Sequence, residues 1–278
     1  MEKWNIPAGY AELAPGPDLA ARVACFWTRR APVSPAGHRV LPDGCVDFIL
    51  TFGPRPLPRP EGSGPHPESQ AIAVGAMTKP LVVREGPRLS IGVRFRPGQA
   101  FAAFGIPAAA ATDALLELRD IEPESRELQD RLLALQSDQE RLAGFVAFVR
   151  RRLAGASEVP PSVRAAVRHI ERAAGNLRVA DLPADTGVTR QQLARQFATH
   201  VGVSPKMLAR VMRARAVLAR ADAARAAYPR PLNWSAIAQD LGYYDQAHLI
   251  DDFKALTGVT PGEWLGQERS SRPGQPLL

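Results

Sequence analysis

Two segments in the first half of the chain alternate apolar and polar residues with a period of two. A Pro-Asp-Gly turn at 42–44 precedes the first, in which the even-numbered positions of 45–50 are apolar. In the second, Leu, Ile, Val and Phe occupy the odd-numbered positions of 89–96. A period of two is typical of β-strands with one buried face. The sequence therefore predicts that residues 1–120 form a β-rich domain with a small barrel-like sheet.

The pattern changes to a helical one in the next segment. Over 138–154 the apolar residues Leu142, Phe145 and Val149 recur at helical spacing, and Asp138 is placed to act as the N-cap. We interpret residues 121–154 as a helical connector that flanks the β domain. The paired prolines of "GASEVPP" resist both helix and sheet, so residues 155–161 are predicted to be the interdomain linker.

One phrase occurs twice after the linker. "FATHVGVSP" (197–205) returns as "FKALTGVTP" (253–261), with Phe, Gly, Val, a hydroxyl residue and Pro in register. Each phrase closes a pattern of helix, glycine turn and helix, which is the order of a helix-turn-helix. The basic stretch between the copies contains no Gly or Pro over 206–227, so it is predicted to be one long helix. The chain thus carries two helix-turn-helix units in an all-α domain over 162–266, followed by a disordered tail at 267–278.

Capping residues mark the starts of the predicted second helices. Thr189 and Asp245 are the capping residues at the starts of the helices expected over 189–200 and 245–256, and Asn233 caps the first helix of the second unit. Pro183 is unusual, because a proline inside a helix lacks the N–H that the helical hydrogen bond needs. Either that helix starts late or its first turn is distorted.

These residues resemble the DNA-binding domain of AraC/XylS-type transcription regulators. The resemblance covers about 162–266, and "GYYDQAHLIDDFKALTGVTPGEW" is its most specific part. The segments "LPDGCVDFIL", "VGAMTKP" and "GVRFRPG" resemble the β-rich sensor region of one subgroup of these regulators. The resemblance implies a small-molecule sensor domain followed by a DNA-binding domain. It also implies RNA polymerase and a second copy of the chain as partners, with the dimer contact in the β domain or in the helices at 124–154.

The second helix of such a unit enters the major groove, and exposed residues near its N-terminus reach the base edges. Arg can read guanine and Gln can read adenine with paired hydrogen bonds. An exposed helix face without DNA contacts is the alternative. The predicted base contacts are Arg190, Gln191, Ala194 and Arg195 in the first unit, and Gln246, Ala247, Ile250 and Asp251 in the second.

Basic residues on and beside these helices are candidates for phosphate contacts, with an ordinary charged surface as the alternative. The candidates are Lys206, Arg210, Arg213 and Lys254. The resemblance leads us to expect a basic residue at position 251, where this chain has an aspartate. Asp251 and Asp252 repel phosphates, so the first unit is expected to dominate specificity.

The charge of the chain is concentrated in its C-terminal part. The 278 residues carry a formal net charge of +7. Residues 161–278 hold 16 Lys and Arg against 10 Asp and Glu, a net charge of +6, which leaves +1 for residues 1–160. An excess confined to one region favours a polyanionic partner, here double-stranded DNA rather than a membrane. Two cysteines, no apolar run of spanning length and no signal-peptide pattern at the N-terminus are the features expected of a cytoplasmic protein.

The two alternating segments suggest a ligand pocket in the β domain. If both strands belong to one small barrel, polar residues of each face the same interior. A satisfied buried ion pair and a solvent-facing row are the alternatives. The candidate pocket residues are Cys45, Asp47, Arg94 and Arg96. The cysteines and nearby His and Asp residues lack close ligand spacing, so no metal or other cofactor is predicted.

The sequence thus favours a DNA-binding transcription regulator controlled by a small molecule over two alternatives. One is a DNA-modifying or repair enzyme with a fused DNA-binding domain, but the chain lacks a Pro-Cys-His context and the common catalytic motifs. The other is an architectural DNA binder without an effector, which leaves the β domain without a purpose. We therefore expect no enzymatic activity.

Overall fold

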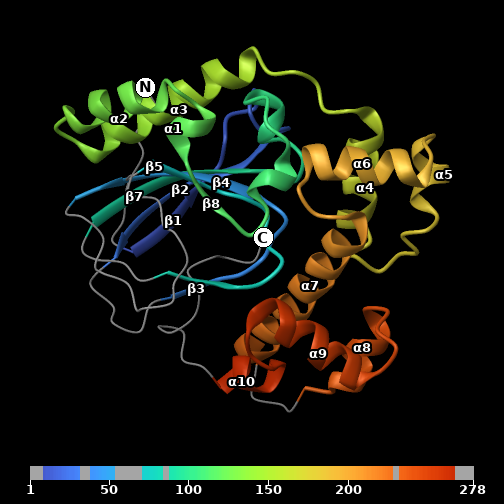
Figure 1. The fold of residues 1–278 in the computed structure, drawn as a ribbon. Helices are drawn as coiled ribbons and strands as arrows, with labels where there is room; N and C mark the ends of the chain where they lie inside the picture. Colours follow the sequence, from blue (N-terminus) through green and yellow to red (C-terminus); the bar gives the residue numbers. More distant parts are fainter. Residues whose placement is uncertain (1–8, 32–37, 54–70, 84–87, 228–231, 267–278) are drawn as a thin grey trace.

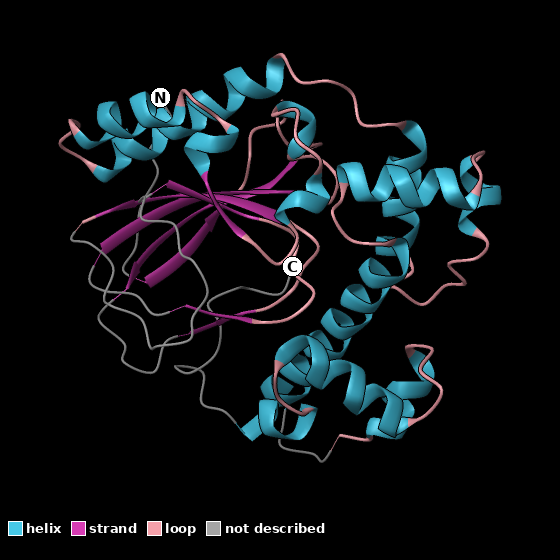
Figure 2. Ribbon diagram, in the orientation of Figure 1, coloured by secondary structure: helices cyan, strands magenta, loops and turns pink. Residues whose placement is uncertain are grey.

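The computed structural model describes residues 9–31, 38–53, 71–83, 88–227 and 232–266. Its N-terminal part is built around β-strands, and its C-terminal part is helical (Figures 1 and 2). The predicted α+β architecture, with a β-rich domain followed by two helix-turn-helix units, is confirmed. The tail at 267–278 lies outside the described residues.

The described strands form two antiparallel sheets. The larger sheet has the strand order β1-β2-β7-β4-β5-β8, and the smaller one pairs β3 with β6. The strands are β1 (Gly9–Leu13), β2 (Val23–Ala31), β3 (His38–Val40), β4 (Val46–Phe52), β5 (Ala71–Val74), β6 (Leu81–Val83), β7 (Arg88–Phe95) and β8 (Leu115–Glu117).

The alternation in the sequence sets the two faces of the larger sheet. Along β4 the even-numbered residues Val46 to Phe52 are buried and the odd-numbered ones are half-buried, as predicted. On the more polar face, Gly92 of β7 lies directly beneath the indole of Trp27. A Cβ at Gly92 would lie 2.1 Å from Trp27 Cε2, so only glycine allows this close approach.

Helices cover the apolar face of the larger sheet (Figure 1). They are α1 (Leu118–Ile121), α2 (Ser125–Leu133) and α3 (Asp138–Ala154), preceded by the short helices η1 (Phe101–Ala103) and η2 (Ala108–Ala111). Leu142 and Phe145 of α3 share one hydrophobic core with Phe26 and Phe48 of the sheet. The predicted connector therefore supplies about a third of the buried residues of the N-terminal core. The N-cap of α3 is Ser137, which forms a capping box with Glu140, and the prediction of Asp138 was wrong by one residue.

The C-terminal part contains seven helices in the described residues. They are α4 (Pro161–Arg172), α5 (Leu182–Thr186), α6 (Arg190–His200), α7 (Pro205–Ala227), α8 (Trp234–Asp240), α9 (Gln246–Thr257) and α10 (Pro261–Gly266). Pairs α5–α6 and α8–α9 are the two helix-turn-helix units, and the long helix α7 runs between them (Figure 1). Among the described residues, no helix has the length and apolar character needed to cross a membrane.

The predicted caps are present at the helix starts. The side chain of Thr189 accepts a hydrogen bond from the Gln192 amide at 3.2 Å, and Asp245 accepts one from the His248 amide at 2.8 Å. Asn233 caps α8 in the same way. Each cap satisfies a backbone donor that the helix leaves free, which fixes where α6 and α9 begin.

The structure decides between the two alternatives for Pro183. Helix α5 starts late, at Leu182, so the proline lies in the first turn, where no helical N–H bond is required. The helix ends at Gly187, whose φ of 69° is left-handed and turns the chain toward α6.

Candidate nucleic-acid interface and the polar cluster of the N-terminal domain

Helix α6 presents the predicted reading face of the first unit to solvent. Its buried residues are Leu193 and Phe197, which pack with Leu182 of α5 in one hydrophobic core. The opposite face is exposed and carries all four predicted base-contact residues, Arg190, Gln191, Ala194 and Arg195. The core thus fixes the helix, and two guanidinium groups and an amide extend from its first two turns.

Helix α9 occupies the equivalent place in the second unit. Leu249 and Phe253 are buried, and Gln246, Ala247 and Asp251 are exposed. Ile250 is half-buried against the core of this unit, so it is less accessible than its counterpart Ala194. The Oε1 atom of Gln246 accepts a hydrogen bond from the Ser235 hydroxyl at 2.8 Å. A base contact from Gln246 therefore has to replace or accompany this bond.

Arg210 is engaged inside the domain. Its Nε and Nη2 atoms both lie 2.6 Å from Oδ1 of Asp252, whose side chain is only 3% exposed. The pair joins α7 to α9. The sequence analysis predicted that Arg210 contacts a phosphate and that Asp252 repels phosphates. In the structure the two side chains form an ion pair, so their charges compensate each other.

Arg213 is likewise held within the domain, whereas Lys206 and Lys254 are exposed. The Arg213 guanidinium carbon lies 4.8 Å from the centre of the Tyr243 ring, and its Nη1 donates to the Gly242 carbonyl at 3.3 Å. Of the four predicted phosphate contacts, these two lysines are exposed, whereas Arg210 and Arg213 are half-buried.

Replacing Asp252 with asparagine should destabilise the C-terminal domain by about 2 kcal/mol, because the buried Arg210 contact loses its charge assistance. Urea unfolding monitored by circular dichroism measures the effect. Asp251→Asn is the matched control, since the neighbouring side chain is exposed and should change stability by less than about 0.5 kcal/mol. Equal unfolding midpoints for the two variants would contradict the structural role of the pair.

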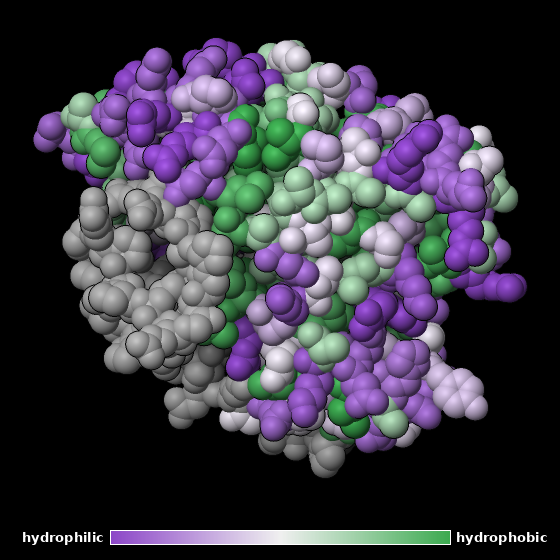
Figure 3. All heavy atoms as spheres, in the orientation of Figure 1, coloured by the Kyte–Doolittle hydropathy of each residue, from purple (hydrophilic) through white to green (hydrophobic). Residues whose placement is uncertain are grey.

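The two units differ in charge. Residues 161–204 carry six Arg against three acidic residues, a net charge of +3, and helix α7 adds +5. Residues 232–266 carry one Lys against five acidic residues, a net charge of −4. On the face drawn in Figure 3, hydrophilic residues cover much of the outer surface of the C-terminal helices. Attraction for DNA phosphates is therefore concentrated in the first unit and α7.

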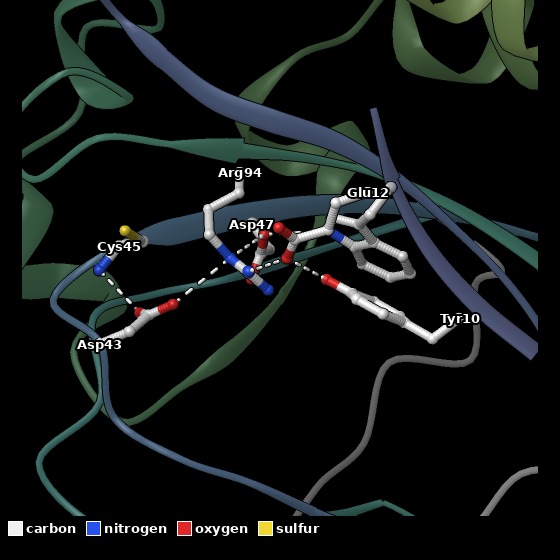
Figure 4. A network of polar contacts seen from close by, with 7 residues as sticks. Tyr10, Glu12, Asp43, Cys45, Asp47 and Arg94 are labelled. Atoms are coloured by element: carbon white, nitrogen blue, oxygen red, sulfur yellow. Dashed lines mark hydrogen bonds and ion pairs between the residues drawn. The ribbon is translucent and has the colours of Figure 1, made fainter. Parts of the chain in front are cut away.

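A polar cluster lies on the less apolar face of the large sheet, centred on Arg94 (Figure 4). Arg94 is 5% exposed. Its Nη1 lies 3.0 Å from Glu12 Oε1, and its Nε lies 3.3 Å from Asp43 Oδ2 and 3.3 Å from Asp47 Oδ1. Three carboxylates thus surround one buried guanidinium, which leaves the cluster with an excess of negative charge.

Aromatic residues complete the cluster. Trp27 Nε1 donates to Asp47 Oδ1 at 3.1 Å, and the Tyr10 hydroxyl donates to Glu12 Oε1 at 2.6 Å. Burial raises the pKa of Asp47 to about 6, although Arg94 opposes the rise. Burial also raises the pKa of Cys25 to about 12, so its thiol is protonated at neutral pH. A protonated thiol is not the nucleophile that cysteine chemistry requires.

The structure brings together part of the predicted pocket. Asp47 and Arg94 form the ion pair that was one of the alternatives, and Cys45 lies next to them (Figure 4). Arg96 does not join them: it is exposed, and its Nε donates to the Ala20 carbonyl at 2.9 Å, so its assignment to the same interior was wrong. Arg96 follows the last residue of β7, so the alternation of the strand no longer determines which way its side chain points.

The sequence reasoning missed four members of the cluster, which are Tyr10, Glu12, Trp27 and Asp43. Three of them lie on β1 and β2, whose alternation was not examined. Asp43 was interpreted as a turn residue and weighed as a metal ligand, but it was not assigned to the pocket. The available signal was the alternation along β1, which places Tyr10 and Glu12 on the same face of the strand.

Two family models match parts of the chain. Residues 11–117 match a domain of unknown function (DUF6597), and residues 182–267 match a helix-turn-helix domain. The second match includes both units and the helix between them. No curated protein sequence matches the chain.

Solved structures of ToxT from Vibrio cholerae match over most of the chain. ToxT from strain O395 has 14% identity and a TM-score of 0.41, over 87% of this chain and 97% of ToxT. ToxT from the same strain bound to (E)-4-(8-methylnaphthalen-1-yl)but-3-enoic acid has the same identity and TM-score, over 87% and 98%. Unsaturated fatty acid bound ToxT from strain SCE256 also has 14% identity and a TM-score of 0.41, over 85% and 91%. At these values the match assigns neither a ligand nor a function to this chain.

Proposed function

We propose that the chain is a sequence-specific DNA-binding transcription regulator that a small molecule controls through the N-terminal domain. The observation that carries this proposal is the pair of helix-turn-helix units with the exposed face of α6 in the most basic part of the chain. Helix α6 reads one major-groove segment through Arg190, Gln191, Ala194 and Arg195. Helix α9 reads the next segment more weakly, with Gln246 as its main reader beside Ala247, Ile250 and Asp251.

Lys206 and Lys254 are proposed as phosphate contacts, because both are exposed, Lys206 at the start of α7 and Lys254 on α9. Arg210 and Arg213 hold α7 against α9 and the turn before it. We propose no enzymatic activity for the chain. RNA polymerase and a second copy of the chain are proposed partners in the cytoplasm.

The polar cluster around Arg94 is the proposed effector site. It combines a few convergent polar groups with the aromatic side chains of Tyr10 and Trp27, which is the composition of a small-molecule site. Cys45 and Asp47 are included, whereas Arg96 is not. Because three carboxylates already engage Arg94, an anionic ligand would have to displace one of them.

Selection from a random duplex library, followed by titration of the enriched site at several salt concentrations, tests the proposal. A regulator of this kind enriches a site that spans two successive major-groove segments. Binding that follows ionic strength without enrichment of any sequence would instead identify an architectural DNA binder. Effector control is then tested by measuring how each compound of a small-molecule library changes the affinity of the protein for the enriched site.

Asp251→Arg should strengthen binding to the enriched site and make the dependence of log K on log salt steeper by about 1, because it replaces a repulsive charge with one phosphate contact. Titration at four salt concentrations measures the slope. Asp120→Arg is the control with the same change of charge on the exposed surface of α1, far along the chain from α9. A similar gain in both variants would show that only net charge matters, and α9 would then not face the DNA.

A further inference from the structure

The turn Leu41–Cys45 is part of the N-terminal domain, yet one of its side chains completes the core of the second helix-turn-helix unit. Leu41 is 7% exposed. It packs in one hydrophobic cluster with Val217 of α7, Leu249 and Phe253 of α9, and Trp264 of α10. The position of α9 relative to α7 therefore depends on a residue from outside the C-terminal domain.

The same turn supplies a carboxylate to the polar cluster. Asp43 is 8% exposed, and its Oδ2 lies 3.3 Å from Nε of Arg94. Its Oδ1 accepts a hydrogen bond from the Cys45 amide at 2.9 Å, which holds the turn closed. One residue, Pro42, separates Asp43 from Leu41, whose side chain enters the second unit, and Figure 4 shows Asp43 and Cys45 beside Arg94.

The residue after Asp43 fixes the turn against α7. Gly44 has a φ of 75°, and a Cβ at this position would lie 2.5 Å from Leu208 Cδ1. The left-handed conformation favours glycine at this position, and any larger residue would also have to displace the end of the Leu208 side chain. The turn has little room to move unless α7 moves with it.

The first unit is held by other segments of the N-terminal domain. The Thr112 hydroxyl, just after η2, donates to the Gly202 carbonyl at 2.7 Å, and Ala76 packs in the hydrophobic core that contains Phe197 of α6. The turn at 41–45 also approaches Leu208 of this core through Gly44, and of the contacting segments named here it is the one that belongs to the polar cluster.

We propose that the turn Leu41–Cys45 positions the second helix-turn-helix unit relative to the first and makes that position depend on the ion pair between Asp43 and Arg94. The inference rests on the proposed function, because the offset between α6 and α9 decides whether both helices meet successive grooves of one duplex. A ligand that binds the cluster better in one state of the Asp43–Arg94 contact shifts this offset. Leu41 and Asp43 are thus positioning residues that touch no DNA.

The test compares full-length variants on two duplexes, the enriched two-segment site and a shortened duplex with only the segment that α6 reads. Asp43→Asn keeps the acceptor for the Cys45 amide and removes the charge that pairs with Arg94. We expect its affinity for the two-segment site to fall roughly 5- to 20-fold, with unchanged affinity for the shortened duplex. Leu41→Ala should show the same pattern, and Leu41→Met, which keeps the volume, should restore binding.

Asp120→Asn and Val82→Ala are the controls, since both side chains are exposed on the N-terminal domain. Hydrogen exchange gives a readout that needs no DNA: Asp43→Asn should increase exchange in α8 and α9 while α6 and the strands β4 and β7 keep their protection. Equal losses on both duplexes, or unchanged exchange in α9, would overturn the inference. If the wild type enriches no sequence, the proposed function fails, and the exchange result alone then decides on the positioning role.

Discussion

Replacing Arg94 with methionine should destabilise the N-terminal domain by about 3–5 kcal/mol, the cost of removing one partner from a buried ionic contact. The change leaves Glu12, Asp43 and Asp47 around a site without a cation. Urea unfolding of the full chain, followed by circular dichroism and by hydrogen exchange in β2, β4 and β7, measures the loss.

The loss should be smaller at pH 5 than at pH 8. Burial raises the pKa of Asp47 to about 6, so the folded state holds this proton more tightly than the unfolded state does. The contribution of Asp47 to stability is therefore present at low pH and is lost as the pH rises toward 6. Arg94 opposes the rise in the pKa, and without it the pKa of Asp47 increases further. In the variant, Asp47 can therefore protonate at pH 5, which avoids part of the cost.

Arg96→Met is the control for this experiment, because Arg96 lies two residues away and is exposed. Its effect should be within about 1 kcal/mol, since it loses one hydrogen bond to a carbonyl. If Arg94→Met unfolds at the same urea concentration as Arg96→Met, or if its loss does not depend on pH, the cluster does not stabilise the domain in the way the contacts indicate.

Replacing Arg195 with alanine should relax the preference at one base pair of the enriched site by about 1–3 kcal/mol. Arg195 is exposed on the second turn of α6, and no carboxylate holds it in the described contacts, so its guanidinium is available to a base edge. Competition titrations against all single-base variants of the site measure the change. A loss confined to one position indicates base reading, whereas a uniform loss with a shallower salt dependence indicates a phosphate contact.

Arg126→Ala is the matched control, since it removes the same charge from the exposed surface of α2 in the N-terminal domain. It should leave base preference unchanged. A specificity profile of Arg195→Ala that is identical to that of the control would remove α6 from the reading role and with it the main support for the proposed function.

Local patterns were sufficient to predict the elements that carry the candidate interface. The alternation over β4, the caps Thr189, Asn233 and Asp245, and the repeated Gly-Val-hydroxyl-Pro phrase each report on backbone geometry within a few residues. They therefore placed α6 and α9 correctly. The exposed faces of these helices follow from the same periodicity.

Contacts between distant residues were not predictable in this way. Arg94 meets Glu12 across 82 positions, and Arg210 meets Asp252 across 42. Neither pair has a local signal, because a charged residue on a helix or strand has the same sequence pattern whether it faces solvent or a buried partner. The packing of Leu41 into the second unit had no signal for the same reason, since its position depends on how two domains meet.

The unequal charge of the two helix-turn-helix units gives the encounter with DNA an order in time. The first unit and α7 are drawn to the polyanion from a distance, whereas the second unit, with a net charge of −4 over residues 232–266, is repelled. Under the proposed function, we therefore expect capture to begin at α6 and α9 to engage afterwards in an intramolecular step. Added salt should then slow the first step far more than the second, because only the first step depends on attraction over a distance.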